Sequence, residues 1–362
     1  MNIIDIKKAI ALVIVWACMI GMGQTVFAQV NVREIRVGIG LSDTHPQGLA
    51  VTKFAELVAK RSEGKIRVRL HANGTLGNDQ SMIEDLKTGK LEMCVPDTAT
   101  LVPQVSGFGI LNIPFLFTTE TDADALLDSP FGDKLQAKLQ EKGLVGLGFW
   151  ENGFRSVTNN ARPILQLEDM HGLRMRVIKN PLYIDMFNAL GSTPVPMPFP
   201  EVYNALHDNK IDGQENPLAT IQNSKFYSVQ KYLTLTRHAY SAWVLLMSKK
   251  LWDELSPQEK AIIKESALEA RDFERKTIRA NNGFLLELLK KEGMTINEVS
   301  TLEHSKLRMA ARPITKKYQK EFGKDWSDAM YLGLTANEMK KFNQATGPAV
   351  STTATANKEA RQ

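Results

Sequence analysis

The sequence predicts an α/β protein made of two units, and three observations lead to this prediction. Short apolar or alternating runs of strand length recur along the chain, with amphipathic helical runs between them. Connections of that length are crossovers, which join parallel or mixed strands and place helices on both faces of a sheet. The same succession then occurs a second time, and a helix of unusual length follows it.

The first unit has five expected elements. A strand at 35–40 precedes an amphipathic helix at 46–62, whose apolar positions fall on one face. Residues 65–71 alternate apolar and charged side chains, which is typical of a half-buried strand. A capped helix at 78–88 and an apolar strand at 91–95 complete the unit.

The second unit repeats this order. It alternates strands with helices, and we expect strands at 143–150, 173–178 and 193–197 and helices at 181–190 and 200–209. The run at 242–248 is again strand-like. It returns the chain to the first unit if the two units are discontinuous in sequence.

The strongest helix signal lies between the second unit and the C-terminus. Ser256 is a typical N-cap, Pro257 suits the first helical position, and Glu259 completes a capping box. Apolar residues recur at helical spacing until Gly293 ends the pattern. Such a helix is about 54 Å long at 1.5 Å per residue, so we expect it to brace both units, with a bend near Gly283.

Both ends of the chain are predicted to lie outside the fold. Residues 1–28 combine two lysines, an apolar run of about 15 residues and small residues before Gln29, which is typical of a cleavable secretory signal peptide. The alternatives are a membrane anchor, which needs about 20 apolar residues, and lipid attachment at Cys18. The tail at 341–362 is rich in Ser, Thr and Ala without periodicity, and we expect it to be disordered.

Composition excludes several classes of protein. With 43% hydrophobic and 23% charged residues, the chain is a globular protein with a sizeable core. Its net charge of +5 is spread along the chain without the basic cluster that a nucleic-acid binder needs. Without the signal peptide only Cys94 remains, so no intramolecular disulfide forms, and its apolar surroundings predict a buried strand residue.

Catalytic and metal-binding signatures are missing. The segment 38–43 begins like a dinucleotide loop, but Asp43 stands where the third glycine is needed. None of the 6 histidines is paired at a spacing typical of a metal site. We therefore expect no catalytic residues, no metal and no cofactor. The alternative is an exported enzyme whose catalytic residues lie far apart in sequence.

Three segments of the second unit carry a family resemblance: 172–177, 193–206 and 211–217. They resemble the extracytoplasmic solute receptors of tripartite ATP-independent periplasmic (TRAP) transporters, the DctP family. The resemblance extends from about residue 35 to about residue 322. It implies a two-lobed periplasmic-binding-protein fold with a long C-terminal helix that braces both lobes. Lobe I would comprise 29–153 and 242–281, and lobe II 154–241 and 282–340.

The resemblance also implies a function in transport. Such a receptor works in the periplasm as a monomer, binds a small organic acid without chemistry, and delivers it to the small and large subunits of the membrane permease. A binding protein of an ATP-driven (ABC) transporter is the alternative with the same two-lobed form. For the ligand we expect a hydroxylated sugar acid, a uronate or an aldonate, with a C4-dicarboxylate as the alternative.

The resemblance assigns three ligand-binding residues. Arg176 matches the family arginine that grips a ligand carboxylate through two parallel hydrogen bonds, a task that suits the planar guanidinium. Its alternative role is an ion pair with an acidic residue such as Glu215. Arg155 matches a second arginine near the ligand, with a structural role as its alternative. Asn216 matches the family's ligand-bonding amide.

Further candidates come from position and residue type. Asp97 follows the strand that bears Cys94, and the resemblance implies an acidic residue at this place in receptors of hydroxylated acids, because a carboxylate can accept hydrogen bonds from sugar hydroxyls. A helix N-cap before Ala99 is its alternative role. Four more side chains are candidates for ligand contact, each with a place in the core as the alternative: Phe199, Trp150, Trp243 and His238.

Overall fold

The structure is a computed structural model that describes residues 30–334. The predicted signal peptide at 1–28 and the predicted tail at 341–362 lie outside the described residues. No helix within 30–334 is long and apolar enough to cross a membrane.

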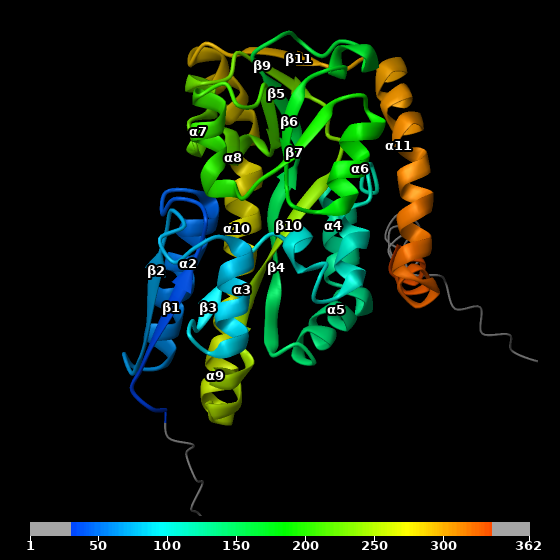
Figure 1. Ribbon diagram of the computed structural model, residues 1–362. Coiled ribbons are helices and arrows are strands. Elements are labelled where there is room, and N and C mark those ends of the chain that lie inside the picture. The colour runs from blue at the N-terminus through cyan, green and yellow to red at the C-terminus, as the bar shows by residue number, and fades with distance from the viewer. Residues whose placement is uncertain (1–29, 335–362) are drawn as a thin grey trace, which may run out of the picture.

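The chain folds into two lobes, each built on a mixed sheet flanked by helices (Figure 1). The sheet of lobe I has the strand order β2-β1-β3-β10-β4. Strand β1 is parallel to β2 and β3, whereas β10 is antiparallel to β3 and β4. The strands are β1 (Arg33–Gly38), β2 (Ile66–His71), β3 (Met93–Cys94), β4 (Leu144–Phe154) and β10 (Tyr240–Ser248).

The sheet of lobe II has the order β11-β9-β5-β8-β6-β7. Strand β6 is parallel to β7 and β8, and β5 is antiparallel to β8 and β9. The strands are β5 (Ser156–Asn159), β6 (Arg174–Val177), β7 (Thr193–Pro196), β8 (Gly213–Asn216), β9 (Tyr232–Leu235) and β11 (Thr295–Glu298). The predicted α/β class and two-lobed form are confirmed.

Local sequence explains most of these elements. In β2, an edge strand, Arg67 and Arg69 are exposed while Ile66 is buried, as the alternation predicted. The strand predicted at 91–95 forms ladder pairs only at β3, and the helix predicted at 200–209 divides into a 3-10 turn and α7.

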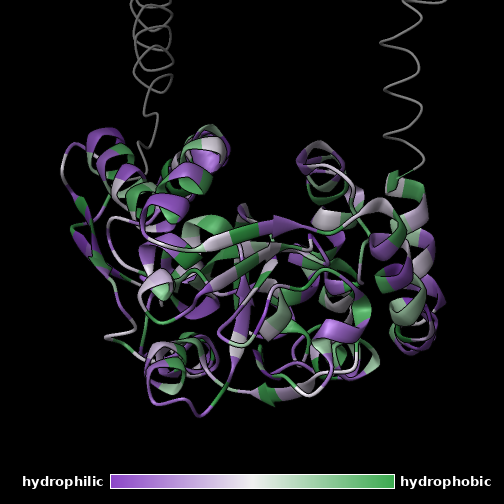
Figure 2. Cartoon of the chain, turned by 90° about the horizontal axis from the view of Figure 1, so that it is seen from above, coloured by the Kyte–Doolittle hydropathy of each residue, from purple (hydrophilic) through white to green (hydrophobic). Residues whose placement is uncertain are grey.

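A further helical stretch begins at residue 324, and ten α-helices lie between residues 46 and 322. They are α2 (Pro46–Arg61), α3 (Asp79–Thr88), α4 (Glu120–Leu127), α5 (Pro130–Gln140), α6 (Pro181–Ala189), α7 (Val202–His207), α8 (Leu218–Asn223), α9 (Lys249–Glu254), α10 (Pro257–Lys291) and α11 (Thr301–Phe322). Figure 2 shows hydrophobic and hydrophilic residues alternating around the outer helices, as expected for helices that cover a sheet.

Helix α10 is the long helix that the sequence predicted. Its Ser256 side chain and Glu259 form the expected capping box, and the helix is continuous through Gly283. Its first half packs on α2 and β4 of lobe I, and it also packs on α8 of lobe II. It therefore braces both lobes.

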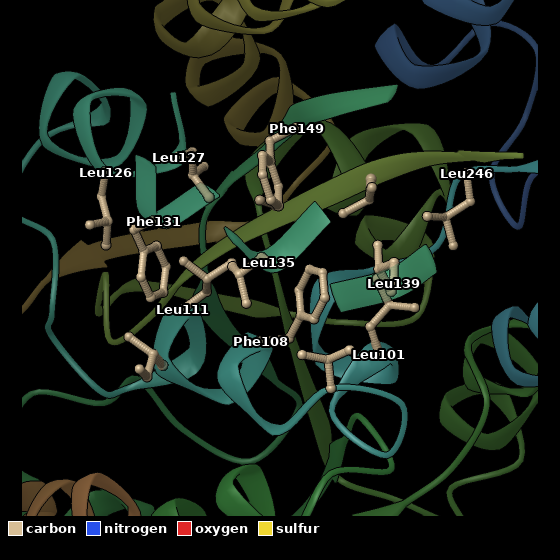
Figure 3. Packing of buried hydrophobic residues seen from close by; sticks show 14 of the residues in the cluster. Leu101, Phe108, Leu111, Leu126, Leu127, Phe131, Leu135, Leu139, Phe149 and Leu246 are labelled. Atoms are coloured by element: carbon tan, nitrogen blue, oxygen red, sulfur yellow. The ribbon is translucent and has the colours of Figure 1, made fainter. Parts of the chain in front are cut away.

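The largest apolar cluster lies on one side of the lobe I sheet, and a second cluster also belongs to this lobe (Figure 3). Phe108, Phe149 and Leu135 lie at the centre of the largest cluster, and Tyr318 and Phe322 of α11 also belong to it. The earlier part of α11 packs in the core of lobe II through Leu307 and Ala311. The prediction had placed 282–340 in lobe II alone, whereas α11 contacts the cores of both lobes.

Candidate functional site

A pocket of about 720 Å³, including its open mouth, lies between the lobes. Lobe I contributes the ends of β1 and β3 and the start of α3, and lobe II contributes the ends of β6, β7 and β8. The carboxyl ends of parallel strands are the usual place for ligands in α/β proteins.

Arg176 is a buried cation of the pocket that forms no ion pair within the described residues. It comes from β6 and is only 3% exposed. Its Nε and Nη2 donate to the carbonyl oxygen of Met197 at 3.1 and 2.9 Å, while Nη1 has no hydrogen-bond partner in residues 30–334. No acidic side chain of the described residues forms an ion pair with it, and burial lowers its pKa to about 10. A buried guanidinium without a carboxylate is suited to receive one from a ligand.

Glu215, considered above as a partner of Arg176, pairs instead with Arg155. The antiparallel register of β5 and β8 sets Ser156 opposite Asn216. The neighbouring residues Arg155 and Glu215 therefore come together at the junction of the lobes. Nη2 of Arg155 donates to the Glu215 carboxylate at 2.9 Å and to its carbonyl oxygen at 2.7 Å, and Nε donates to the same carboxylate.

Both charges of this pair are buried, and each stabilises the charged form of the other. Burial acts to lower the pKa of Arg155, but the Glu215 carboxylate raises it overall. Burial likewise acts to raise the pKa of Glu215, and Arg155 with His238 lowers it overall. Arg155 does line the pocket, but most of its donors are used inside the protein. Its Nη1 lies 3.2 Å from the hydroxyl of Ser241.

Asp97 both caps a short helical turn and lines the pocket, as its two alternative roles required. Its Oδ1 accepts a hydrogen bond from the N–H of Ala99 at 2.9 Å, which caps a 3-10 turn, and the residue lines the pocket. Its Oδ2 accepts hydrogen bonds from Ser241 and from Asn152. The carboxylate therefore keeps limited acceptor capacity for a ligand hydroxyl.

Asp79 is a pocket residue that the sequence analysis missed. Its Oδ2 accepts a hydrogen bond from the N–H of Asp97 at 2.9 Å. Burial raises the pKa of Asp79 to about 7, the nearby Asp97 charge adds to this rise, and the hydrogen bond and Arg176 oppose it. The sequence predicted a capped helix at 78–88, but the pattern alone does not show that the start of this helix faces the other lobe.

Three other predicted residues line the pocket. Phe199 packs near Arg176, with its ring centre 5.9 Å from the guanidinium carbon. Trp243 lines the lobe I wall. Asn216 accepts a hydrogen bond from Arg155 at 3.1 Å and donates to Gln214 at 2.6 Å.

Two predicted ligand contacts are corrected. Trp150 is fully buried in the lobe I core and does not line the pocket. His238 is also absent from the pocket walls, because its ring nitrogens contact Glu215 at 3.2 Å and Thr236 at 2.8 Å. Both side chains take the core positions that were their alternatives.

Most of the polar residues that the sequence analysis missed share one location. They stand at or near the beginning of the helix that follows a strand, where chain position and topology together could have indicated them: Gln47, Asn78, Asp79, Gln80, Thr100, Lys179 and Thr220. Within 30–334 no group of His, Cys, Asp and Glu could hold a metal ion. Cys94 is a buried free cysteine in β3, as predicted.

Comparison of the sequence with known protein families identifies the family to which the chain belongs. The model of the bacterial extracellular solute-binding protein family 7, DctP, matches residues 37–321. The chain belongs to this family. It is thus a TRAP-type extracytoplasmic solute receptor, as the resemblance implied, and its family consists of substrate-binding receptors rather than enzymes.

Relatives of this DctP-family receptor bind different acids. The sugar acid binding protein DctPAm from Advenella mimigardefordensis strain DPN7T, solved in complex with galactonate, is 42% identical with a TM-score of 0.83, covering 85% of this chain and 99% of that chain. The 2,3-diketo-L-gulonate-binding periplasmic protein YiaO of Escherichia coli (strain K12) is 36% identical, covering 73% and 80% of the two chains. The C4-dicarboxylate-binding protein DctB of Bacillus subtilis (strain 168) is 31% identical, covering 79% and 82%.

Replacing Asp79 in the receptor with Asn tests the electrostatics of the pocket. Because the folded pKa of about 7 lies above the ordinary 3.8, the contribution of Asp79 to the stability of the unliganded wild type falls as the pH rises from about 4 to about 7. The amide has no such titration, and its oxygen can still accept the N–H of Asp97. We expect the variant to be more stable by about 4 kcal/mol above pH 7 and equally stable near pH 3. Chemical denaturation across this range measures the difference, and a difference independent of pH would contradict the expectation.

Proposed function

We propose that this receptor captures a hydroxylated monocarboxylic acid, an aldonate or a uronate, between its lobes and delivers it to a TRAP membrane permease. Arg176 is the observation that carries the proposal. It is a buried cation at the pocket wall, without an acidic partner among residues 30–334 and with Nη1 unbonded. Burial of an uncompensated charge costs several kcal/mol, and a bidentate ligand carboxylate offsets that cost.

The rest of the pocket favours hydroxyl groups over a second carboxylate. Asp79 and Asp97 line the same pocket, and both interact electrostatically with Arg176. Carboxylates accept hydrogen bonds from hydroxyls but repel a second ligand carboxylate. The wall also offers amides and hydroxyls that pair with a polyol chain: Gln47, Asn78, Gln80, Thr100, Asn152, Asn216 and Thr220. Phe199 would pack on the carbon chain of the acid.

Two relatives support this ligand class, since one was solved with galactonate and another is named for 2,3-diketo-L-gulonate. The second candidate is a C4-dicarboxylate, which the relative DctB is named for. Its second carboxylate would need Lys179, the other basic residue of the pocket besides the two arginines. Lys179 is exposed, so its attraction is screened more strongly than that of Arg176.

The family match and the residue pattern of 1–28 support a periplasmic setting for this function. We propose that residues 1–28 are a cleavable signal peptide and that the mature receptor works in the periplasm as a monomer. Its partners would be the small and large permease subunits, and it would release the acid unchanged. The family match favours the TRAP permease over an ATP-driven transporter.

A thermal-shift panel on protein purified from the periplasm tests the ligand class. The panel contains galactonate, galacturonate, succinate, malate and galactitol, which has the hydroxyls of galactonate without its carboxylate. A ligand at a thousand times its dissociation constant adds about 4 kcal/mol of stability, or several degrees in a chain of this size. We expect galactonate or galacturonate to give the largest shift and galactitol none. The largest shift with succinate or malate would reject the sugar acid in favour of a dicarboxylate.

A further inference from the structure

A second set of contacts joins the two lobes beside the mouth of the pocket. Ser42 and Thr44 follow β1 in lobe I, whereas Asn223 is the last residue of α8 in lobe II. The Ser42 hydroxyl donates to Oδ1 of Asn223 at 2.8 Å, and Nδ2 of Asn223 donates to the Thr44 hydroxyl at 3.1 Å. The two hydroxyls lie 2.9 Å apart. The three side chains therefore close a ring of hydrogen bonds across the gap between the lobes.

These residues stand beside the ligand pocket rather than in it. None of the three lines the pocket. Ser42 and Asn223 line a neighbouring hollow, which shares the walls Gly40, Leu41, Phe199 and Pro200 with the pocket. A ligand held by Arg176 therefore need not contact the ring.

The short helix α8 connects the ring to the pocket. Thr220 lies three residues before Asn223 on α8, lines the pocket, and contacts Asn152 and His45 of lobe I at 3.4 Å each. Movement of α8 away from lobe I would break the contacts of both residues. The ring is partly open to water, so its bonds can exchange for water when the lobes separate.

We propose that Ser42, Thr44 and Asn223 form an interlobe latch, which stabilises the closed receptor and prolongs ligand residence without touching the ligand. The proposal rests on the proposed function, because lobe closure matters for a receptor that traps a solute. A latch of this kind acts on the closed state alone. Its loss raises the dissociation rate and leaves the association rate nearly unchanged.

Asn223→Ala tests the latch, and Gln222→Ala is the matched control. Gln222 precedes Asn223 on α8, is similarly half-buried, and makes no side-chain hydrogen bond with the described residues. With galactonate as the probe, stopped-flow measurement should show dissociation about tenfold faster for Asn223→Ala and unchanged for Gln222→Ala. The double variant with Ser42→Ala should dissociate no faster than Asn223→Ala alone. Wild-type dissociation in Asn223→Ala would overturn the latch.

A cross-link tests the same contact without relying on any ligand. The variant Ser42→Cys with Asn223→Cys should form a disulfide between the lobes under mild oxidation, since Cys94 is buried and cannot compete. Galactonate should accelerate the reaction. Absence of the disulfide with and without galactonate would overturn the latch. A disulfide whose rate no acid of the panel changes would support the closed contact and count against the proposed ligand class.

Discussion

Replacing Arg176 with Met is expected to weaken galactonate binding by more than a hundredfold while the unliganded protein keeps its stability. Charge-assisted hydrogen bonds contribute about 1.5 to 3 kcal/mol each, and every 1.4 kcal/mol is tenfold in affinity. The guanidinium does not stabilise the unliganded fold, because it is a buried charge without an acidic partner in 30–334, and burial holds its pKa below the ordinary value. Met fills a similar volume, and water at the pocket can satisfy the carbonyl of Met197.

Arg176→Lys separates the charge from the geometry. Lysine keeps the positive charge but lacks the planar fork that matches a carboxylate. We expect its affinity for galactonate to lie well below that of the wild type. Isothermal titration calorimetry gives both affinities, and thermal denaturation of the unliganded variants checks the fold. Affinity near that of the wild type in Arg176→Met would reject Arg176 as the clamp.

Replacing Arg155 with Met should, in contrast to Arg176→Met, lower the stability of the unliganded protein. Both members of the Arg155–Glu215 pair are at most 1% exposed, so the substitution strands a buried carboxylate and costs about 3 to 5 kcal/mol of folding free energy. The pKa of Glu215 is held below its ordinary 4.5 in the fold. The stability that the pair contributes is therefore present above about pH 4.5 and is lost as the pH falls through the folded pKa. The loss of folding free energy caused by Arg155→Met should therefore be smaller at acidic pH than at neutral pH.

The double variant Arg155→Met with Glu215→Leu is the control for this prediction. It removes both charges, and apolar replacements of a buried ion pair are often neutral or stabilising. Urea denaturation should find it more stable than Arg155→Met alone. If Arg155→Met matched the wild type in stability at neutral pH, the pair could not be the structural element that its burial indicates.

The elements predicted best are those whose signals are local. Helix α10 begins at the expected cap because Ser256, Pro257 and Glu259 satisfy its first turn among themselves. Helix α4 was not predicted, although Thr119 and Asp122 form a similar capping box. It is only 8 residues long, so its periodic pattern covers barely two turns.

The site was harder to predict, because its chemistry depends on which strands become neighbours. Both Arg155 and Arg176 stand near Glu215, and the sequence does not indicate which of them pairs with it. The register of β5 on β8 decides the question in favour of Arg155 and leaves Arg176 for a ligand. Asp79 illustrates the same limit, because its role comes from the packing of the α3 terminus against Asp97.

A crystal structure of the wild-type receptor grown with galactonate tests the central claim most directly. The account predicts closed lobes, a ligand carboxylate within hydrogen-bond distance of the Arg176 guanidinium, and ligand hydroxyls at Asp79 or Asp97. A carboxylate bound at Lys179 or at Arg155 instead, with Arg176 still bonded only to Met197, would contradict it.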